Sequence, residues 1–141
     1  MTIEELLDQD FGTLSDLVAA QGRERSDQLA LVDGERLLSY GQLNVLLDQI
    51  AFGLQRDGVK QGEAVAVCAS TSLEYAALFF GILRAGAVVA PLAPSSTPES
   101  LVAMLADCGA THFFSDAGVA TALAPLADRI NATRIAMDGS A

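Results

Sequence analysis

Two short stretches of the sequence carry the polar side chains best placed to bind a ligand. Residues 69–72 read ASTS and residues 93–97 read APSST, and each follows an apolar run and precedes a run with helical periodicity. In a sheet of parallel strands, ligands bind just past the carboxyl ends of the strands. Hydroxyl and amide groups at a helix N-terminus can hold an anion, but the same groups also serve simply to cap the helix. The sequence leaves both interpretations open for both stretches.

The other polar residues and glycines are not spaced as a catalytic, phosphate-binding or metal site requires. His112, the only histidine, opens a predicted strand, and Lys60, the only lysine, lies in a turn. Four residues separate Gly81 from Gly86, but Ala87 stands where a phosphate-binding loop requires lysine. Metal ligation needs clustered Cys, His or carboxylate groups, and the sequence shows no such cluster. We therefore predict no catalytic residue and no metal site within these 141 residues.

The elements that must position the two stretches alternate between helices and short strands. An Asp33-Gly34 pair between two apolar runs predicts a small β-hairpin near residues 29–39, with a type I′ turn. Such alternation predicts an α/β fold with a mostly parallel sheet and helices on both faces. Helices are expected over residues 13–25, 40–57, 73–85, 98–108 and 117–129, and strands over residues 65–68, 87–92, 111–115 and 133–137.

Local signals fix several ends of these elements. Ser39 with Gln42 three residues later forms a capping box at the start of a helix. Thr97 followed by Pro98 marks another helix start, because the missing N–H of proline does no harm at the first position. Gly58 is expected to end a helix in the left-handed conformation, and Gly86 is expected to end another where the chain reverses tightly. We expect one α/β domain or subdomain over residues 1–141.

Composition excludes several classes of function. The net charge is −10 and the eight Lys and Arg residues are scattered, so we reject nucleic acid and anionic membrane surfaces as main partners. Residues 76–93 hold a single charge, that of Arg84, but Gly86 and Pro91 divide this run into a helix, a turn and a strand rather than a membrane span. Cys68 and Cys108 are both expected to be buried thiols. No secretory signal precedes them, so we expect a cytoplasmic protein.

Four segments resemble one known family in order and in spacing. LSYGQL at residues 38–43, GVKQGEAVAV at 58–67, LRAGAVVAPL at 83–92 and DCGA at 107–110 are similar to segments near the start of AMP-forming acyl-CoA synthetases and adenylation domains. Each segment alone is weak evidence. Spacing and order match across residues 14 to about 116, and together the segments are specific to the adenylate-forming superfamily, which also includes luciferases.

The resemblance implies an acid–thiol ligase that uses ATP and Mg²⁺. A small-molecule carboxylic acid would be converted to an acyl-adenylate, and CoA would then receive the acyl group as a thioester. Acyl- or aryl-CoA ligases are favoured over a fatty-acyl-AMP ligase or a peptide-synthetase adenylation domain. The reason is that peptide-synthetase domains more often carry KAGxAYVPLD where this chain has RAGAVVAPL. A non-catalytic α/β binding module is the third alternative.

The resemblance also implies that this chain is an N-terminal fragment of a longer protein. Family members carry a phosphate loop ending in lysine and a lysine on a mobile C-terminal domain, and this sequence has neither. We therefore expect the fragment to be inactive alone, to bind no cofactor and to expose apolar surface that promotes homo-oligomers. By resemblance, Ala93, Pro94 and Ser95 would border the tunnel for CoA in the whole enzyme.

Overall fold

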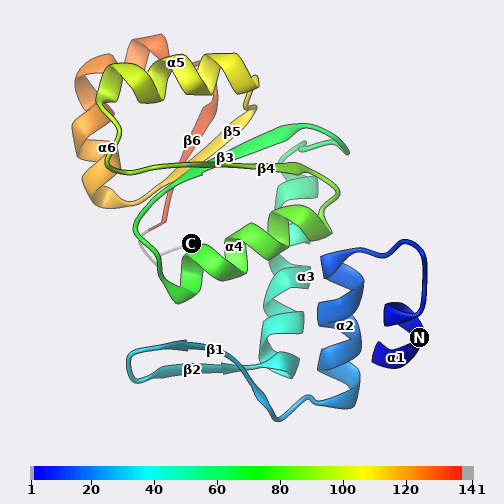
Figure 1. Ribbon diagram of the computed structural model, residues 1–141. Helices are drawn as coiled ribbons and strands as arrows, with labels where there is room; N and C mark the ends of the chain where they lie inside the picture. The colour runs from blue at the N-terminus through cyan, green and yellow to red at the C-terminus, as the bar shows by residue number, and fades with distance from the viewer. Residues whose placement is uncertain (1, 138–141) are drawn as a thin grey trace.

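A parallel sheet of four strands forms the centre of the computed structural model, which describes residues 2–137 (Figure 1). The strands follow the order β4-β3-β5-β6 across the sheet. Every neighbouring pair is parallel. Their bounds are Ala64–Cys68 for β3, Val88–Leu92 for β4, His112–Ser115 for β5 and Thr133–Ala136 for β6. The predicted α/β class with a parallel sheet is confirmed.

Helices cover both faces of this sheet. The helices α3 (Tyr40–Arg56) and α4 (Leu73–Arg84) lie on one face, while α5 (Pro98–Cys108) and α6 (Ala117–Leu123) lie on the other. The central strand β3 sends Val65 and Val67 into the first layer and Ala66 and Cys68 into the second, as the two-residue period of a strand requires. All four side chains are fully buried, which explains why β3 reads as a continuous apolar run.

The N-terminal elements pack outside α3 and α4. They are α1 (Ile3–Leu7), α2 (Leu14–Glu24) and the antiparallel hairpin of β1 (Leu29–Asp33) and β2 (Arg36–Ser39). Figure 1 shows α2 alongside α3, with α1 on the outer side of α2 and the hairpin extending from the lower end of α3 on the side away from α1. No helix was predicted over Ile3–Leu7, although Thr2 and Glu5 form the capping box that signals the start of α1.

The turn of the hairpin differs from the predicted type. The strands pair Asp33 with Arg36, so the two loop residues are Gly34 and Glu35 rather than Asp33 and Gly34. Gly34 has a φ of +62°, and no described residue other than glycine has a positive φ. A type I′ turn needs a positive φ at both loop residues, so the type I′ prediction is wrong. A glycine with positive φ in the first loop position alone is the pattern of a type II′ turn.

The last predicted helix, over residues 117–129, is divided in two. The α-helix α6 ends at Leu123, and a 3₁₀ segment, η1 (Ala124–Arg129), follows it. Pro125 lies at the start of this segment, where its ring and missing N–H interrupt the α-helical hydrogen bonds.

Gly86 and Pro91 act as the sequence predicts, with one refinement. Gly86 has a φ of +81°, and its N–H donates to the Leu83 carbonyl at 3.0 Å, which ends α4. Pro91 lies inside the edge strand β4, one residue before its end. The N–H of Val88 donates inward to the Glu63 carbonyl, so the nitrogen of Pro91, three positions later, faces the free edge, where no donor is needed.

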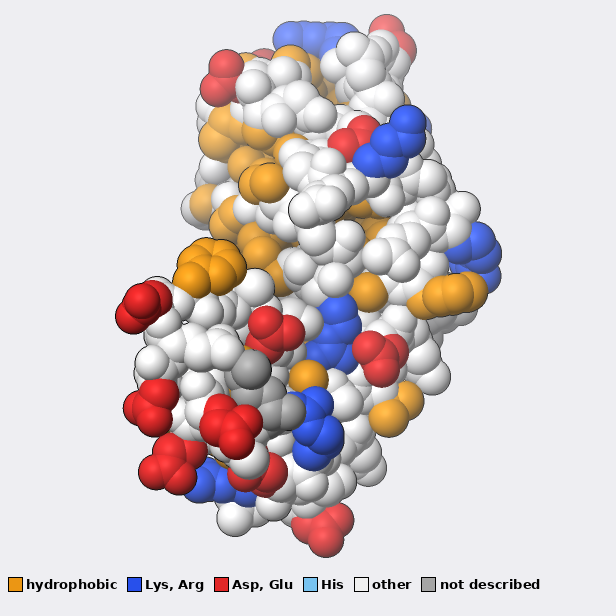
Figure 2. All heavy atoms as spheres, turned by 90° about the vertical axis from the view of Figure 1, so that its right-hand side faces the viewer, with side chains coloured by type: hydrophobic (Ala, Val, Ile, Leu, Met, Phe, Trp, Pro, Cys, Tyr) orange, Lys and Arg blue, Asp and Glu red, His pale blue; other side chains and the backbone are white. Residues whose placement is uncertain are grey.

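The surface separates acidic from apolar side chains. Figure 2, which looks onto the side that carries α1 and α2, shows acidic side chains gathered over its lower part and hydrophobic ones over its upper part, where the sheet lies. Glu4, Glu5 and Asp16 lie in the first turns of α1 and α2, where a negative charge stabilises a helix.

Within residues 2–137, no helix is both long and apolar enough to cross a membrane. Cys108 is exposed, so the prediction that both cysteines are buried is wrong for this one.

Candidate functional site

A cavity of about 330 Å³ lies at the carboxyl ends of β3 and β5. The chain leaves β3 through α4 on one face of the sheet and leaves β5 through α6 on the other, so the two connections diverge above this point. Such a divergence opens the crevice in which α/β proteins bind ligands. The cavity, called the switch-point cavity below, is lined by Ala69, Ser70, Thr71, Ser72, Glu74, Asp116 and Met137.

Three polar groups in and just after residues 69–72 have partners within the protein. The Ser72 hydroxyl accepts a hydrogen bond from the Tyr75 N–H at 3.1 Å and so caps α4. The Ser70 N–H donates to Asp116 Oδ2 at 2.9 Å, and the Leu73 N–H donates to Asp33 Oδ2 at 3.1 Å. The amides of Ser70 and Leu73 are thus bonded to the protein's own carboxylates. The structure supports helix capping for this stretch rather than anion binding.

Asp116 joins the two loops of the switch-point cavity. Its Oδ1 accepts a hydrogen bond from the Val119 N–H at 3.0 Å and caps α6. Its Oδ2 accepts a hydrogen bond from the Ser70 N–H, 46 positions away in the sequence. Asp116 was not among the residues predicted from the sequence. An aspartate between a strand and a run with helical periodicity is a capping signal, but nothing in the sequence shows that its second oxygen reaches another loop.

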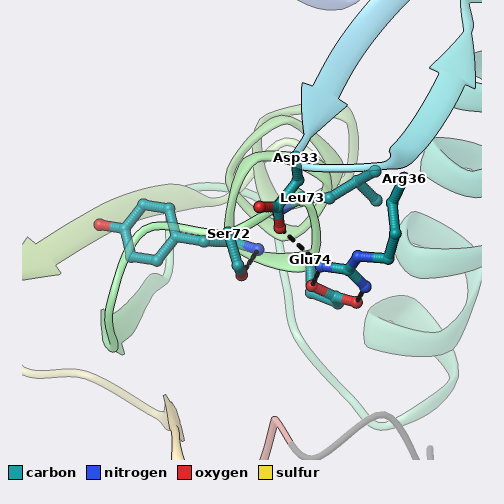
Figure 3. A network of polar contacts seen from close by, with 6 residues as sticks. Asp33, Arg36, Ser72, Leu73 and Glu74 are labelled. Carbon is teal, nitrogen blue, oxygen red and sulfur yellow. Dashed lines mark hydrogen bonds and ion pairs between the residues drawn. The ribbon is translucent and has the colours of Figure 1, made fainter.

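An ionic cluster fastens the hairpin to the start of α4 (Figure 3). The Arg36 guanidinium, from β2, donates to both carboxylate oxygens of Glu74 and, at 2.6 Å, to Asp33 Oδ2. Asp33 also accepts from the backbone of Leu73, so one carboxylate connects the hairpin with the first turn of α4. We call Asp33, Arg36 and Glu74 the hairpin clamp. Because Glu74 also lines the switch-point cavity, the clamp fixes one wall of it.

The hairpin clamp lowers the pKa of both carboxyl groups. Hydrogen bonds from Arg36 hold the pKa of Glu74 at about 2. The pKa of Asp33 is also lowered, first by its hydrogen bond with Arg36 and then by the Leu73 N–H. The same contacts raise the pKa of Arg36. A depressed carboxyl pKa means that the charged form is the one that the folded state stabilises.

We expect Arg36→Ala to move the Glu74 pKa from about 2 toward its ordinary value of 4.5. Because the folded-state pKa lies below the unfolded one, the clamp stabilises the fold above about pH 4.5 and loses this effect as the pH falls toward 2. Carboxyl carbon shifts in an NMR acid titration measure this change. Arg56→Ala is the matched control, since Arg56 lies 3.7 Å from Asp57 in an exposed pair. A Glu74 midpoint that is the same in the wild type and in Arg36→Ala would contradict the assigned cause.

The second predicted stretch lies beside the switch-point cavity but does not line it. The register pairs Cys68 with Leu92, so the chain continues into residues 69–72 and 93–97 at neighbouring positions on one edge of the sheet. Ala93, Pro94 and Ser95 are exposed in a turn. The Thr97 hydroxyl accepts from the Ser100 N–H at 3.2 Å and caps α5. The structure thus places Ala93, Pro94 and Ser95 at this edge, where a ligand bound above the sheet could reach them.

The electrostatics of the switch-point cavity are acidic. Glu74 and Asp116 contribute carboxylates, and no Lys or Arg is among the described residues that line the cavity. Cys68, at the end of β3, is fully buried, and burial together with the nearby charge of Asp116 raises its thiol pKa to about 11. A thiol with such a pKa is not a nucleophile at neutral pH. Within residues 2–137, no group of His, Cys, Asp or Glu is arranged to hold a metal ion.

A known protein family matches most of the chain. Residues 18–139 match the family described as AMP-binding enzyme. This range covers the sheet, the hairpin and both layers of helices.

Several curated proteins are similar in sequence. Malpibaldin synthetase of Mortierella alpina is 39% identical over 94 residues, which are 66% of this chain and 2% of that protein. Tyrocidine synthase 2 of Brevibacillus parabrevis is 36% identical over 96 residues, or 68% of this chain and 3% of that protein. Bacitracin synthase 1 of Bacillus licheniformis is 31% identical over 127 residues, or 90% of this chain and 2% of that protein. The chain thus spans only a few per cent of the length of these relatives.

Solved structures share the fold. A complex of VinN with 3-methylaspartate has a TM-score of 0.82 and 26% identity, and the match covers 90% of this chain and 35% of that chain. The N-terminal domain of FACL13 from Mycobacterium tuberculosis has a TM-score of 0.84 at 20% identity, and the match covers 91% of this chain and 34% of that chain. At 20% identity, the second match shows the fold alone.

Proposed function

The chain belongs to the family of AMP-binding enzymes, and from this membership we propose that it is the N-terminal part of a longer enzyme that activates a carboxylic acid with ATP. In the first step, a carboxylate oxygen attacks the α-phosphorus of ATP. The bond between the α-phosphorus and its bridging oxygen breaks, and pyrophosphate leaves. In the second step, a thiolate attacks the acyl carbon and releases AMP. The match over residues 18–139 is the observation that carries this proposal.

ATP does not fit the switch-point cavity of this chain. A triphosphate needs cationic or amide donors, whereas the lining side chains with charge are the carboxylates Glu74 and Asp116. The amide of Ser70 is already bound by Asp116. We therefore propose that ATP and Mg²⁺ are held by parts of the parent enzyme outside these 141 residues. The role of this chain is to build a rigid sheet edge beside that site, and we expect the chain alone to release no pyrophosphate from ATP.

The identity of the thiol acceptor separates two forms of the proposal. CoA is the acceptor if the parent is an acyl- or aryl-CoA ligase, and RAGAVVAPL at residues 84–92 favours this form. The thiol of a carrier protein is the acceptor if the parent contains a peptide-synthetase adenylation domain. The relatives with 31–39% identity are named as synthases of tyrocidine and bacitracin and as malpibaldin synthetase, which favours the second form.

Pyrophosphate exchange by the parent protein tests the proposal. The parent is incubated with ATP, Mg²⁺ and a panel of carboxylic and amino acids, and exchange of labelled pyrophosphate into ATP reports adenylate formation. Thioester formation is then measured with CoA and, separately, with a phosphopantetheinylated carrier protein. Exchange with at least one acid supports the proposal, and the preferred thiol assigns the acceptor. A pure, folded parent that exchanges with no acid would contradict adenylation.

A bulky side chain at Ser95 tests the proposed position of the thiol tunnel. We expect Ser95→Trp in the parent to raise the KM for the thiol substrate about tenfold, equivalent to about 1.4 kcal/mol of binding, and to leave pyrophosphate exchange unchanged. Ala103→Trp, at an exposed position on α5, is the matched control. An unchanged KM in Ser95→Trp would place the tunnel elsewhere.

A further inference from the structure

A second cavity, of about 190 Å³, lies between α6 and the last two strands of the sheet. We call it the β6 cavity. Its apolar walls include Phe113 from β5, Leu123 from α6 and Ala136 from β6, and its polar side chains are those of Ser115 and Arg134. The β6 cavity shares no lining residue with the switch-point cavity.

The register of the sheet brings the two polar side chains onto one face. Strands β5 and β6 are parallel, and Phe113 pairs with Arg134 while Ser115 pairs with Ala136. Side chains alternate between the faces of a sheet, so Ser115 and Arg134 both project from the face that Phe113 occupies. A strand spacing of about 4.8 Å and a rise of about 6.6 Å over two residues separate their Cα atoms by about 8 Å. An arginine side chain spans this gap, so one small molecule can contact both groups.

Neither polar side chain has a partner within the part of the chain that the structure describes. Arg134 makes no ion pair or hydrogen bond there. Ser115 is only 5% exposed, and its hydroxyl makes no hydrogen bond to any residue in 2–137. That hydroxyl is still reachable, because the unpaired side-chain atoms that are sealed from solvent are Gln21 Oε1 and Asn44 Oδ1. A mostly buried hydroxyl without a partner is uncommon in proteins, and a ligand in the β6 cavity could supply one.

The charge of the β6 cavity favours an anion. No Asp or Glu is among its described lining residues, so nothing in the wall opposes the Arg134 guanidinium. A guanidinium donates two parallel hydrogen bonds to the two oxygens of a carboxylate, and a hydroxyl can donate a third. A phosphate carries more charge and a further oxygen, for which this wall offers no second cation. A carboxylate therefore matches the donors better than a phosphate does.

The apolar walls limit the rest of the ligand to a short hydrocarbon chain. Phe113 and Leu123 are 1% and 2% exposed and belong to the packed layer between the sheet, α5 and α6. The small side chains of Ala120 and Ala136 leave the space beside them open. Pockets for drug-sized ligands usually have volumes of about 300–1,000 Å³, and the β6 cavity is smaller. It suits a ligand with only a few carbon atoms.

We propose that the β6 cavity binds a short-chain aliphatic carboxylate. The Arg134 guanidinium and the Ser115 hydroxyl donate hydrogen bonds to the carboxylate oxygens, and the hydrocarbon chain packs against Phe113 and Leu123. This site is separate from the proposed adenylation, because it lies on residues outside the switch-point cavity and needs neither ATP nor a thiol. Its test measures binding alone, so a negative result leaves the proposed function untouched.

Butyrate and butyramide provide a matched pair of probes. They are nearly equal in size, but only butyrate is charged at pH 7. Titration of the 141-residue chain, followed by amide shifts in NMR, should show butyrate binding about tenfold more tightly, with shifts concentrated at Ser115, Ala120 and Ala136. Arg134→Met should abolish this preference, and Ser115→Ala should weaken butyrate binding about fivefold. Arg25→Met, at an exposed position, makes the same change in net charge and should keep the preference.

Chain length tests the apolar part of the site. Each methylene added between acetate and butyrate should tighten binding by about fourfold if it is buried. Ala120→Leu fills the space beside the chain and should remove this gain while leaving the affinity for acetate unchanged. Ala120 is exposed on α6, so this substitution leaves the core intact. Equal affinity of acetate and butyrate for the wild type would overturn the proposed position of the hydrocarbon chain.

The remaining outcomes separate the proposal from its alternatives. Equal affinity of butyrate and butyramide, or a preference for butyrate that survives Arg134→Met, would overturn the carboxylate assignment. Equal losses in Arg134→Met and Arg25→Met would do the same, because they would reflect net charge alone. No binding of butyrate at tens of millimolar would overturn the site itself. The parent protein is titrated in the same way. If the chain binds butyrate and the parent does not, another part of the parent covers Arg134, and the proposal of a free ligand is wrong.

Discussion

Replacing Gly81 with alanine is expected to lower the free energy of unfolding, because overpacking a core usually costs about 1–3 kcal/mol. Gly81 lies in the middle of α4, where this helix crosses α3. A Cβ atom at this position would lie 2.4 Å from Ile50 Cγ2 and 2.7 Å from Ile50 Cβ. Ile50 Cβ cannot move without its helix, so α3 and α4 must separate. The gain in helix propensity from glycine to alanine, about 1 kcal/mol, offsets only part of this cost.

Gly53→Ala is the matched control for Gly81→Ala. Gly53 lies in the interior of α3, and a Cβ there would meet nothing within 4 Å. The same substitution should therefore stabilise the protein by about 0.5–1 kcal/mol. Urea denaturation followed by circular dichroism measures both variants. If the two substitutions shift the urea midpoint in the same direction, the close contact between Gly81 and Ile50 does not determine the effect of the added methyl group.

The contrast between Gly81 and Gly53 has a cause that no short window of sequence contains. The apolar period predicts α3 and α4, but a glycine inside either helix looks the same from the sequence. What separates the two glycines is the neighbouring helix, because Ile50 of α3 reaches Gly81 of α4 only once the helices have packed. The two helices could therefore be predicted from the sequence, but their point of closest approach could not.

Features with local causes were predicted well. Ser39 and Gln42 make both hydrogen bonds of the capping box, Thr97 caps α5, and Gly86 ends α4 with a positive φ. Each involves residues within a few positions of one another, so the chemistry is visible in a short window. The predicted turn type was wrong because the register of the two strands, which sequence spacing leaves open, decides which residues form the loop.

The candidate site was predicted only in part, for the same reason. The parallel-sheet pattern placed residues 69–72 and 93–97 at one edge of the sheet, and the register brings them there. Asp116 and Glu74, which give the switch-point cavity its charge, were not predicted as part of it. Asp116 bonds to Ser70 and Glu74 to Arg36, across 46 and 38 positions. Because of these contacts, the edge of the sheet that resembled an anion site in the sequence carries carboxylates instead. This is why the proposed ATP site is placed outside this chain.

Replacing Arg84 with methionine should destabilise the protein by about 2–3 kcal/mol, because one guanidinium connects three helices. From α4, Arg84 donates to the Ser15 hydroxyl at 2.8 Å and the Ser15 carbonyl at 3.2 Å in α2. It also donates to the Asn44 carbonyl at 2.9 Å in α3. Its side chain is only 12% exposed, so these bonds are shielded from water. The ion pair with Asp48 adds little, since that carboxylate is 70% exposed.

The position of Arg84 predicts which part of the fold loosens. In Arg84→Met, amide hydrogen exchange should accelerate in α2, whose attachment depends on the guanidinium, and change least in α5 on the opposite face of the sheet. Arg84→Lys should recover only part of the loss, because an ammonium group cannot reach acceptors on both α2 and α3 with the fixed fork of a guanidinium. Arg56→Met, at a side chain that is 72% exposed, should change the unfolding free energy by no more than about 0.5 kcal/mol. Equal acceleration of exchange in α2 and α5 would mean that Arg84 contributes to global stability without holding α2 in place.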